Sequence, residues 1–377
     1  MKRVINSCIA VLLGVAVMSA VIVLCSENPS VSLAAFFLKP FSTRGYIRAL
    51  FHKAGLFVCM ALGASCALKT GMINLGGDGQ IYAAGFVTAL LLREYWGVGF
   101  LLQWSVALLC ALSVAGILAC VSGILKAWLA TSEMITSFLL STACVPLIDA
   151  LIITVTRDPA GNLLATAPVH SHFILQQQTS LFGVPAVLTY ASLVALAVGC
   201  FFSYTRVGYQ FRICGKAPEF GRFVGFPVWA TYVWGMVLSG ALFGLTGFFS
   251  VVGLFGTCYV GFSVGMGYAA LAHALIAHAH ITVLVPLAFF FAWMETASEA
   301  AVLGAHLTVN VVLFLQAAIF LLISAQWSAP WNAVRRGARR VYRFLVTVFC
   351  FRGEKHRTRR RHALSVHDTH HRRSRWE

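Results

Sequence analysis

Long apolar stretches follow one another through most of this 377-residue chain, and they limit its fold more than any other feature. Several of them reach the roughly 20 apolar residues with which an α-helix crosses the hydrocarbon core of a membrane. Charged residues make up 11% of the chain, whereas soluble domains carry about 25%. We therefore predict an all-α polytopic integral membrane protein. A soluble enzyme, a disordered chain and a secreted disulfide scaffold fit this composition poorly.

The apolar pattern predicts about ten transmembrane helices, with eight or nine as alternatives. The candidate spans are 4–24, 53–70, 78–92, 98–122, 133–155, 183–203, 229–252, 267–279, 282–300 and 305–325. The first is longer than the roughly 7–15 apolar residues of a secretory signal, so we expect it to stay uncleaved. An amphipathic stretch at 30–51 is predicted to lie at the membrane interface, and a polar stretch at 157–182 is predicted to be an outer loop.

Basic residues predict the orientation of these spans. Residues 335–377 hold 14 of the 28 Lys and Arg but only 3 of the 12 Asp and Glu, within a formal net charge of +16. Because loops rich in Lys and Arg stay inside, we expect both termini in the cytoplasm, with Arg93 as an exception in an outer turn. The arginines that open the tail share one helical face, which suits contact with anionic lipids. No recognition module accompanies them, so no nucleic-acid partner is expected.

Motifs for catalysis and metal binding are missing from the sequence. The eleven cysteines stand singly without a CxxC pair, and no Walker A, GxSxG, HExxH or dinucleotide motif occurs. His273, His278 and His280 are closely spaced but have no carboxylate or thiolate beside them, so we interpret them as packing or interfacial residues. We expect no enzyme activity, no metal and no cofactor of this chain's own.

Two glycine-rich segments interrupt the apolar pattern, one in each half of the chain. The first, 71–80, places Asn74 and Asp78 among four glycines, and the second covers 253–267. Non-helical backbone at membrane depth persists only where it lines protein or water, and paired breaks are typical of a substrate pathway. Close helix packing through small residues is the alternative interpretation.

Acids in or beside the predicted spans are candidates for function by default. They are Asp78, Glu133, Asp149, Glu295 and Glu299. Asp149 and Glu295 lie deepest, and the pattern indicates no basic partner for either. A stand-alone secondary transporter, coupled to H⁺ or Na⁺ through these two acids, is therefore the alternative function. A membrane scaffold that recruits partners through the basic tail is a third possibility.

Four segments, in order, resemble the permease subunits of bacterial ABC importers, in the group for branched-chain amino acids, simple sugars, nucleosides and riboflavin. The segment GMINLGGDGQ (71–80) resembles a "G-L-x-N-I-G-x-E-G-Q" signature, with Asp78 in place of Glu. SEMITSFLLS (132–141) resembles "N-E-x-I-x-T-x-M-L-N", with Ser137 and Ser141 near the family's Thr and Asn. The strongest match is 208–249, which contains GYQFRICGKAP and LSGALFGLTG, and the fourth is GMGYAALAHALIAH (265–278).

The loop between the sixth and seventh spans, 204–227, has a pattern that can be interpreted without the resemblance. It is short and basic, and its glycines and prolines predict a short helix flanked by sharp turns. The resemblance implies that this cytoplasmic helix docks on a separate ATPase. The residues assigned to this coupling are Arg212, Gly215, Lys216, Pro218, Glu219, Arg222 and Gly225, with Phe211, Phe220 and Phe223 as anchors.

The resemblance implies import of a small neutral polar metabolite by alternating access, in a bacterial inner (cytoplasmic) membrane. Riboflavin or a nucleoside ranks first, then a simple sugar, then a branched-chain amino acid. The expected pathway residues are Asn74, Asp78, Gln80, Glu133, Thr136 and Ser137. The expected partners are an ABC ATPase that binds ATP and Mg²⁺, a second permease, a periplasmic or lipid-anchored binding protein, and membrane lipids. The chain then divides into an N-terminal anchor (1–52), the permease domain (53–326) and a basic cytoplasmic tail (327–377).

Overall fold

The computed structural model describes residues 29–175 and 185–305, together with Ser19 and Val23. Almost all of the predicted spans 4–24 and 305–325, and the whole of the tail 327–377, lie outside the described residues. The described part is built from helices and two isolated β-bridges. The helices are α2 (Pro29–Phe37), α3 (Arg44–Lys69), α4 (Gly77–Leu92), α5 (Phe100–Leu129), α6 (Glu133–Leu151), α7 (Ala186–Tyr204), α8 (Arg206–Lys216), α9 (Pro218–Phe223), α10 (Val228–Ser250), α11 (Met266–Ile276) and α12 (Ile281–Ala305).

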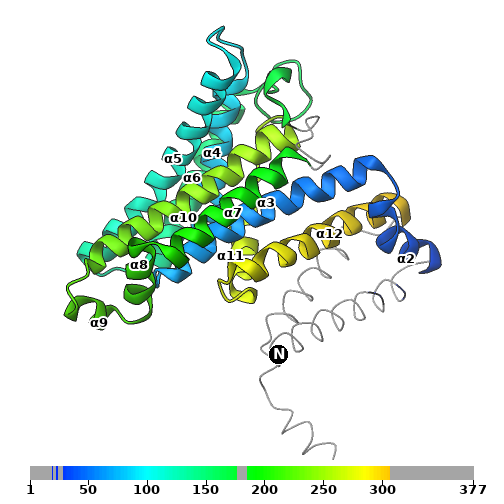
Figure 1. Cartoon of the computed structure of the whole chain (residues 1–377). Helices are drawn as coiled ribbons and strands as arrows, with labels where there is room; N and C mark the ends of the chain where they lie inside the picture. Colours follow the sequence, from blue (N-terminus) through cyan, green and yellow to red (C-terminus); the bar gives the residue numbers. More distant parts are fainter. Residues whose placement is uncertain (1–18, 20–22, 24–28, 176–184, 306–377) are drawn as a thin grey trace, which may run out of the picture. The chain divides into compact units, whose positions relative to one another are not determined.

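Among the described residues, six helices are long and apolar enough to cross a membrane. They are α3, α5, α7 and α12, together with α6 and α10, which continue through the π-helical turns η2 (Ile152–Thr156) and η6 (Val251–Phe255). The all-helical membrane fold is therefore confirmed, and six of the predicted ten spans are found as such. Figure 1 shows these helices running side by side.

Two predicted spans are helices too short to cross a bilayer alone. With a rise of 1.5 Å per residue, the 16 residues of α4 span about 24 Å and the 11 residues of α11 about 16 Å, against a hydrocarbon core of about 30 Å. Each begins inside one of the two glycine-rich segments. The predicted span 267–279 is therefore only a short helix, which ends in a tight turn where His278 and Ala279 have positive φ.

The predicted interfacial stretch 30–51 does not form one element, and its C-terminal part belongs to α3. Helix α2 and the 3₁₀ turn η1 (Lys39–Phe41) occupy its first half, but α3 already begins at Arg44. The Thr43 hydroxyl caps α3 by accepting a hydrogen bond from the Tyr46 N–H, so the start of this helix is locally encoded. The spanning helix is therefore longer at its N-terminus than the apolar run alone indicated, because it includes Arg44 and Arg48.

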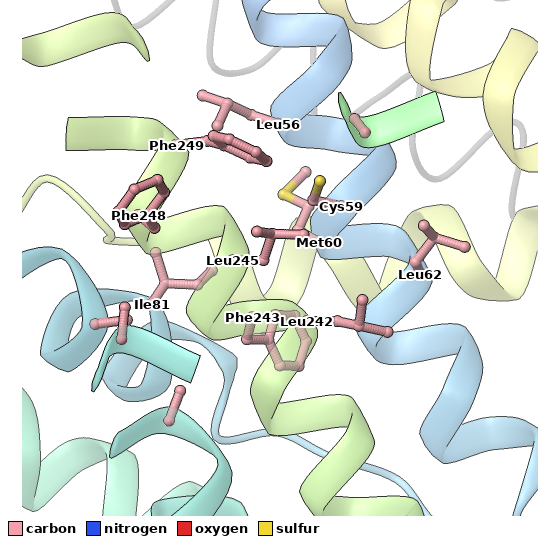
Figure 2. Close-up of a cluster of buried hydrophobic side chains, with 14 of the residues drawn as sticks. Leu56, Cys59, Met60, Leu62, Ile81, Leu242, Phe243, Leu245, Phe248 and Phe249 are labelled. Carbon is pink, nitrogen blue, oxygen red and sulfur yellow. The ribbon is translucent and has the colours of Figure 1, made fainter. Parts of the chain in front are cut away.

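Helices α3 and α10 form the centre of the packing. Of their most apolar windows, 83% and 78% is buried within the chain, compared with 17% for α6. Figure 2 shows the side chains that fill the space between α3, α10 and α4. They include Leu56, Cys59, Met60 and Leu62 of α3, Leu242, Phe243, Leu245, Phe248 and Phe249 of α10, and Ile81 of α4.

Helix α10 packs on α5 through small residues that bring the two backbones together. Ala111 and Ala115 of α5 are fully buried at four-residue spacing, as are Ala107 and Ala119 in the same column. A Cβ placed on Gly244 would lie 2.7 Å from the carbonyl oxygen of Ala111, and one on Gly240 would lie 2.5 Å from that of Ala115. Such close approach maximises van der Waals contact between apolar helices.

Candidate functional site

The first glycine-rich segment (71–80), called the break below, is extended at 72–76 and continues as the first turn of α4 from Gly77. Asn74 lies in its middle and is 1% exposed. Its amide group donates to Gln80 Oε1 (2.9 Å) and Ser239 Oγ (3.0 Å), while its oxygen accepts from the Gly76 N–H (2.9 Å) and Gln80 Nε2 (3.2 Å). These bonds account for the polar capacity of Asn74, so it holds the extended segment against α4 and α10.

Helix α6 holds the same segment through two hydroxyl groups. Ser137 Oγ accepts a hydrogen bond from the Leu75 N–H (3.1 Å) and donates to the carbonyl oxygen of Glu133 (2.7 Å). One turn further along, Ser141 Oγ accepts from the Gly79 N–H (2.7 Å). Because residues four apart share a helix face, the two serines form a pair directed at the break.

Asp78 connects the two glycine-rich segments. Its carboxylate accepts hydrogen bonds from the backbone N–H groups of Gly267 (2.6 Å) and Gly265 (3.2 Å). A Cβ on Gly77 would lie 2.7 Å from the Cα of Gly267, so the starts of α4 and α11 touch backbone to backbone. Both helix N-termini carry partial positive charge, and the carboxylate between them is favourably placed.

The six predicted pathway residues separate into two groups in the structure. Asn74, Asp78, Gln80 and Ser137 gather at the break and are bonded within the chain, as described above. The Glu133 carboxylate lies 3.0 Å from the Lys126 ammonium across the α5–α6 turn, and the Thr136 hydroxyl donates to the Ser132 carbonyl (3.1 Å). Pairing of Glu133 with a lysine was not expected from the sequence.

A crevice opens between the break, α5 and α6. It is lined by Gly76, Gly79, Gln80, Leu118, Ser137, Leu140, Ser141 and Cys144. Its cavity volume is about 0 Å³, whereas pockets for small ligands measure roughly 300–1,000 Å³. This crevice is therefore too small to enclose a nucleoside or a sugar within the chain in this conformation.

The loop 204–227 folds as two helices, α8 and α9, where the sequence predicted one. The Thr205 hydroxyl starts α8 by accepting from the Gly208 N–H (3.0 Å), and Pro218 occupies the first turn of α9. Phe211 is buried against Phe201 and Phe202 at the end of α7, which fixes α8 to the bundle. Phe211 is therefore a packing residue of this loop, whereas the sequence had proposed it as an anchor for a partner.

The sequence predicted that the glycines of this loop form sharp turns, but the structure gives them different roles. Only Gly225, where α9 has ended, has a positive φ (+85°). Gly215 lies in the last turn of α8, and a Cβ there would lie 2.4 Å from the carbonyl oxygen of Lys69 and 2.7 Å from the Gly71 nitrogen. Gly71 in turn has φ +75°, and its own Cβ would lie 2.6 Å from the Gly215 carbonyl oxygen. The loop therefore touches the first glycine-rich segment backbone to backbone.

The surface of the α8–α9 pair that faces away from the bundle carries both aromatic and charged side chains. Phe223 is 90% exposed and Phe220 53%. Glu219 and Arg222 form an exposed ion pair (3.1 Å), Arg212 lies beside the Tyr209 ring, and Lys216 is exposed. Aromatic side chains this exposed on a short loop are typical anchors of a protein interface.

The deep acids have partners that the sequence did not indicate. Lys53 of α3 is buried, and its ammonium lies 2.6 Å from a Glu299 oxygen and 3.0 Å from a Glu295 oxygen, both on α12. The Tyr82 hydroxyl donates to the Asp149 carboxylate and accepts from the Gly261 N–H. The expectation that the acids lack a basic partner is therefore wrong for Glu295, which pairs with Lys53, whereas Asp149 bonds to a tyrosine hydroxyl. Both acids join helices together.

The described part of the predicted outer loop is bonded to the second glycine-rich segment. The Thr166 N–H donates to the Cys258 carbonyl (2.9 Å), and the Val169 N–H donates to that of Gly256 (2.8 Å). The Cys258 N–H returns a bond to the Thr166 hydroxyl (3.1 Å). Residues 157–175 are thus connected, through 256–267 and Asp78, to the break at the start of α4.

The structure is that of a multi-pass membrane protein. It combines apolar helices that run side by side, two glycine-rich segments in contact with each other, and a helical loop between α7 and α10. Residues 46–324 match the family described as "Branched-chain amino acid transport system / permease component". The chain belongs to this family of ABC importer permeases, as the resemblance of its four segments predicted.

Similar proteins of known name are also ABC transporter permeases. The guanosine ABC transporter permease protein NupP of Bacillus subtilis is 23% identical over 272 residues, 71% of this chain and 78% of the relative. The nucleoside ABC transporter permease protein NupB of Lactococcus lactis is 22% identical and covers 65% of this chain and 70% of the relative. The glucose ABC transporter permease protein TsgB13 of Haloferax volcanii is 23% identical and covers 84% and 85%.

Proposed function

We propose that this chain is the membrane permease of an ATP-driven importer for nucleosides, with simple sugars as the next candidate substrates. Family membership and the names of the relatives support this proposal. The single observation that carries it is the α8–α9 helix pair, which is packed on the bundle by Phe211 and presents Phe220 and Phe223 outward. In this proposal the helix pair is the cytoplasmic docking element for a separate ABC ATPase that binds ATP and Mg²⁺.

The substrate class follows from the relatives and from the neutral character of the break. Asn74, Gln80, Ser137 and Ser141 supply amide and hydroxyl groups, and no Lys or Arg bonds to them among the described residues. An uncharged ligand with several hydroxyls and ring nitrogens suits such surroundings, while a multiply anionic ligand needs basic partners. Nucleosides and riboflavin both meet these requirements, and relatives named for guanosine and nucleosides favour the nucleosides.

A second permease subunit completes the pathway in this proposal. The small crevice at α6 does not enclose a substrate, and only 17% of the apolar window of α6 is buried within the chain. Met134, Phe138 and Thr142 lie on the exposed side of this helix. We place the second permease, identical or related, across from this side, so that the pathway runs between the two α6 helices. Lipid is the alternative neighbour of the same surface.

The membrane placement belongs to the same proposal. The chain lies in the inner membrane of a bacterium, with both termini and α8–α9 in the cytoplasm and the loop 157–175 outside. A periplasmic or lipid-anchored binding protein delivers the substrate to the outer side. The connection from 157–175 through 256–267 to Asp78 supports such a docking place, because it leads from that loop to the break.

Transport in proteoliposomes tests the function. The chain, its ATPase and its permease partner are reconstituted with the binding protein, and uptake of radiolabelled guanosine, glucose and riboflavin is measured with and without ATP. We expect guanosine uptake that requires ATP and persists when ionophores remove all ion gradients. Uptake that needs an ion gradient and no ATPase would instead establish the secondary transporter. That rival is not favoured by the structure, because its two relay acids are engaged with Tyr82 and Lys53.

A further inference from the structure

Segment 70–80, which runs from the end of α3 into the first turn of α4, contacts four other helices. At its start, Gly71 touches Gly215 of α8. In its middle, Asn74 is bonded to α10, and its N–H groups at Leu75 and Gly79 are bonded to α6. At its end, Asp78 is bonded to the start of α11. Four separate helices therefore meet on these eleven residues.

At the contact between Gly71 and Gly215 the two backbones touch, with no space for a side chain between them. Each glycine, given a Cβ, would place it within 2.6 Å of a backbone atom of the opposite strand of chain. Side chains between two elements can change rotamer and absorb a displacement, whereas backbone atoms in contact cannot. A movement of α8 along the direction of this contact is therefore passed to residue 71.

The same segment that contacts α8 at Gly71 is hydrogen-bonded to α6 further along the chain. Ser137 and Ser141 accept hydrogen bonds from backbone N–H groups of the segment, and both are largely buried. Helix α6 has few neighbours within the chain, so these two bonds are prominent among its ties to the rest of the bundle. Other directed contacts of α6 are those of Asp149 with Tyr82 of α4 and of Glu133 with Lys126 of α5. A helix with so few ties follows the groups to which it is bonded.

We propose that segment 70–80 is the transmission element of this permease, which receives displacement from α8 at Gly71–Gly215 and moves α6 through Ser137 and Ser141. This inference rests on the proposed function, because it assumes that an ATPase moves α8. It assigns a positioning role to Asn74, Gln80 and Ser137 through their hydrogen bonds within the chain. It also adds Ser141, which the sequence had not selected, as a positioning residue.

Two variants with matched controls test the proposal in the complete reconstituted complex. Gly215→Ala introduces a clash at the contact, and Gly199→Ala in α7 is its control, since the nearest atom to that Cβ is 3.7 Å away. Ser137→Ala removes one bond to the segment, and Ser192→Ala, at an exposed position of α7 away from the segment and from α6, is its control. Ser137→Thr keeps the hydroxyl and serves as a rescue.

The readouts are ATP hydrolysis, guanosine transported per ATP and the yield of assembled complex. We expect Gly215→Ala and Ser137→Ala to assemble and to hydrolyse ATP within twofold of wild type. Transport per ATP falls about tenfold in each, which corresponds to about 1.4 kcal/mol. For Ser137→Ala this equals the loss of about one buried hydrogen bond. Both controls and Ser137→Thr retain wild-type coupling. The double variant is no worse than either single one, because both act on one linkage.

Hydrogen exchange in the wild-type complex provides a second measurement that needs no variant. ATP binding should change the exchange of peptides covering 70–80 and 133–144 together. Unchanged exchange at 70–80, or normal coupling in Ser137→Ala, overturns the transmission element. If the wild-type complex shows no ATP-dependent uptake at all, the proposed function fails instead, so the two failures are distinguishable.

Discussion

Replacing Lys53 with methionine tests what the charged cluster between α3 and α12 contributes to the fold. Methionine keeps most of the volume of the lysine stem but removes the ammonium that contacts both Glu295 and Glu299. The lysine side chain is 7% exposed, while the two carboxylates are 35% and 55% exposed. The variant therefore removes the most buried member and leaves two acids facing each other one helical turn apart.

The size of the effect follows from burial. Removing one partner of a buried ion pair costs about 3–5 kcal/mol, and because the acids are partly exposed we expect the lower end, about 3 kcal/mol. Glu299→Gln removes the more exposed acid and keeps a neutral pair of Lys53 with Glu295, so its cost is less than about 1 kcal/mol. The triple variant K53M/E295Q/E299Q leaves no charge behind and should regain most of the lost stability.

Thermal unfolding of detergent-purified protein measures this order, with the fraction that stays monodisperse after heating as the signal. We expect Lys53→Met to lower the midpoint by about 5 °C or more, Glu299→Gln to shift it slightly, and the triple variant to return close to wild type. A Lys53→Met variant as stable as wild type would show that the cluster contributes nothing. A triple variant as unstable as the single one would attribute the loss to packing of the lysine stem instead.

The same unfolding assay applies to two further sites, and pull-down to a third. Gly244→Ala places a Cβ 2.7 Å from a backbone oxygen of α5 and should cost about 1–3 kcal/mol, whereas Gly116→Ala, with its nearest atom at 3.7 Å, should be neutral or stabilising. Tyr82→Phe loses bonds to Asp149 and to a backbone N–H, and should cost about 1–3 kcal/mol; an equally stable variant contradicts that role. Phe223→Ala should weaken retention of the ATPase on the immobilised permease while leaving the unfolding midpoint unchanged, because this side chain is 90% exposed.

Much of the fold could be predicted from the sequence because hydropathy and helix length are linked directly. The apolar run at 229–252 became α10 with an error of a few residues. Helix α3 starts earlier than the predicted span 53–70, because Arg44 and Arg48 lower the local hydropathy while the Thr43 cap sets where the helix begins. The cap residue is a signal that sequence reading alone can use.

The site was located more reliably than its chemistry. The motif around Asn74 indicated the correct segment, but its buried bonds join parts of the chain that are 165 residues apart, such as Ser239, and no local pattern reveals them. Lys53 was missed as a partner of the α12 acids for the same reason. Ser137 and Ser141, by contrast, are four residues apart on one helix, and that spacing could have marked them as a pair.

The alanine column of α5 and the glycines of α10 have a consequence for how the bundle deforms. Two backbones in direct contact, without interposed side chains, resist both sliding and rotation. Helices α5 and α10 therefore move as one rigid unit. During a transport cycle, conformational change must then be concentrated in elements with fewer contacts to this rigid unit, such as α6. A spin-label pair with one label on each of these two helices should therefore report a constant distance throughout turnover, while a pair joining α10 to α6 should not.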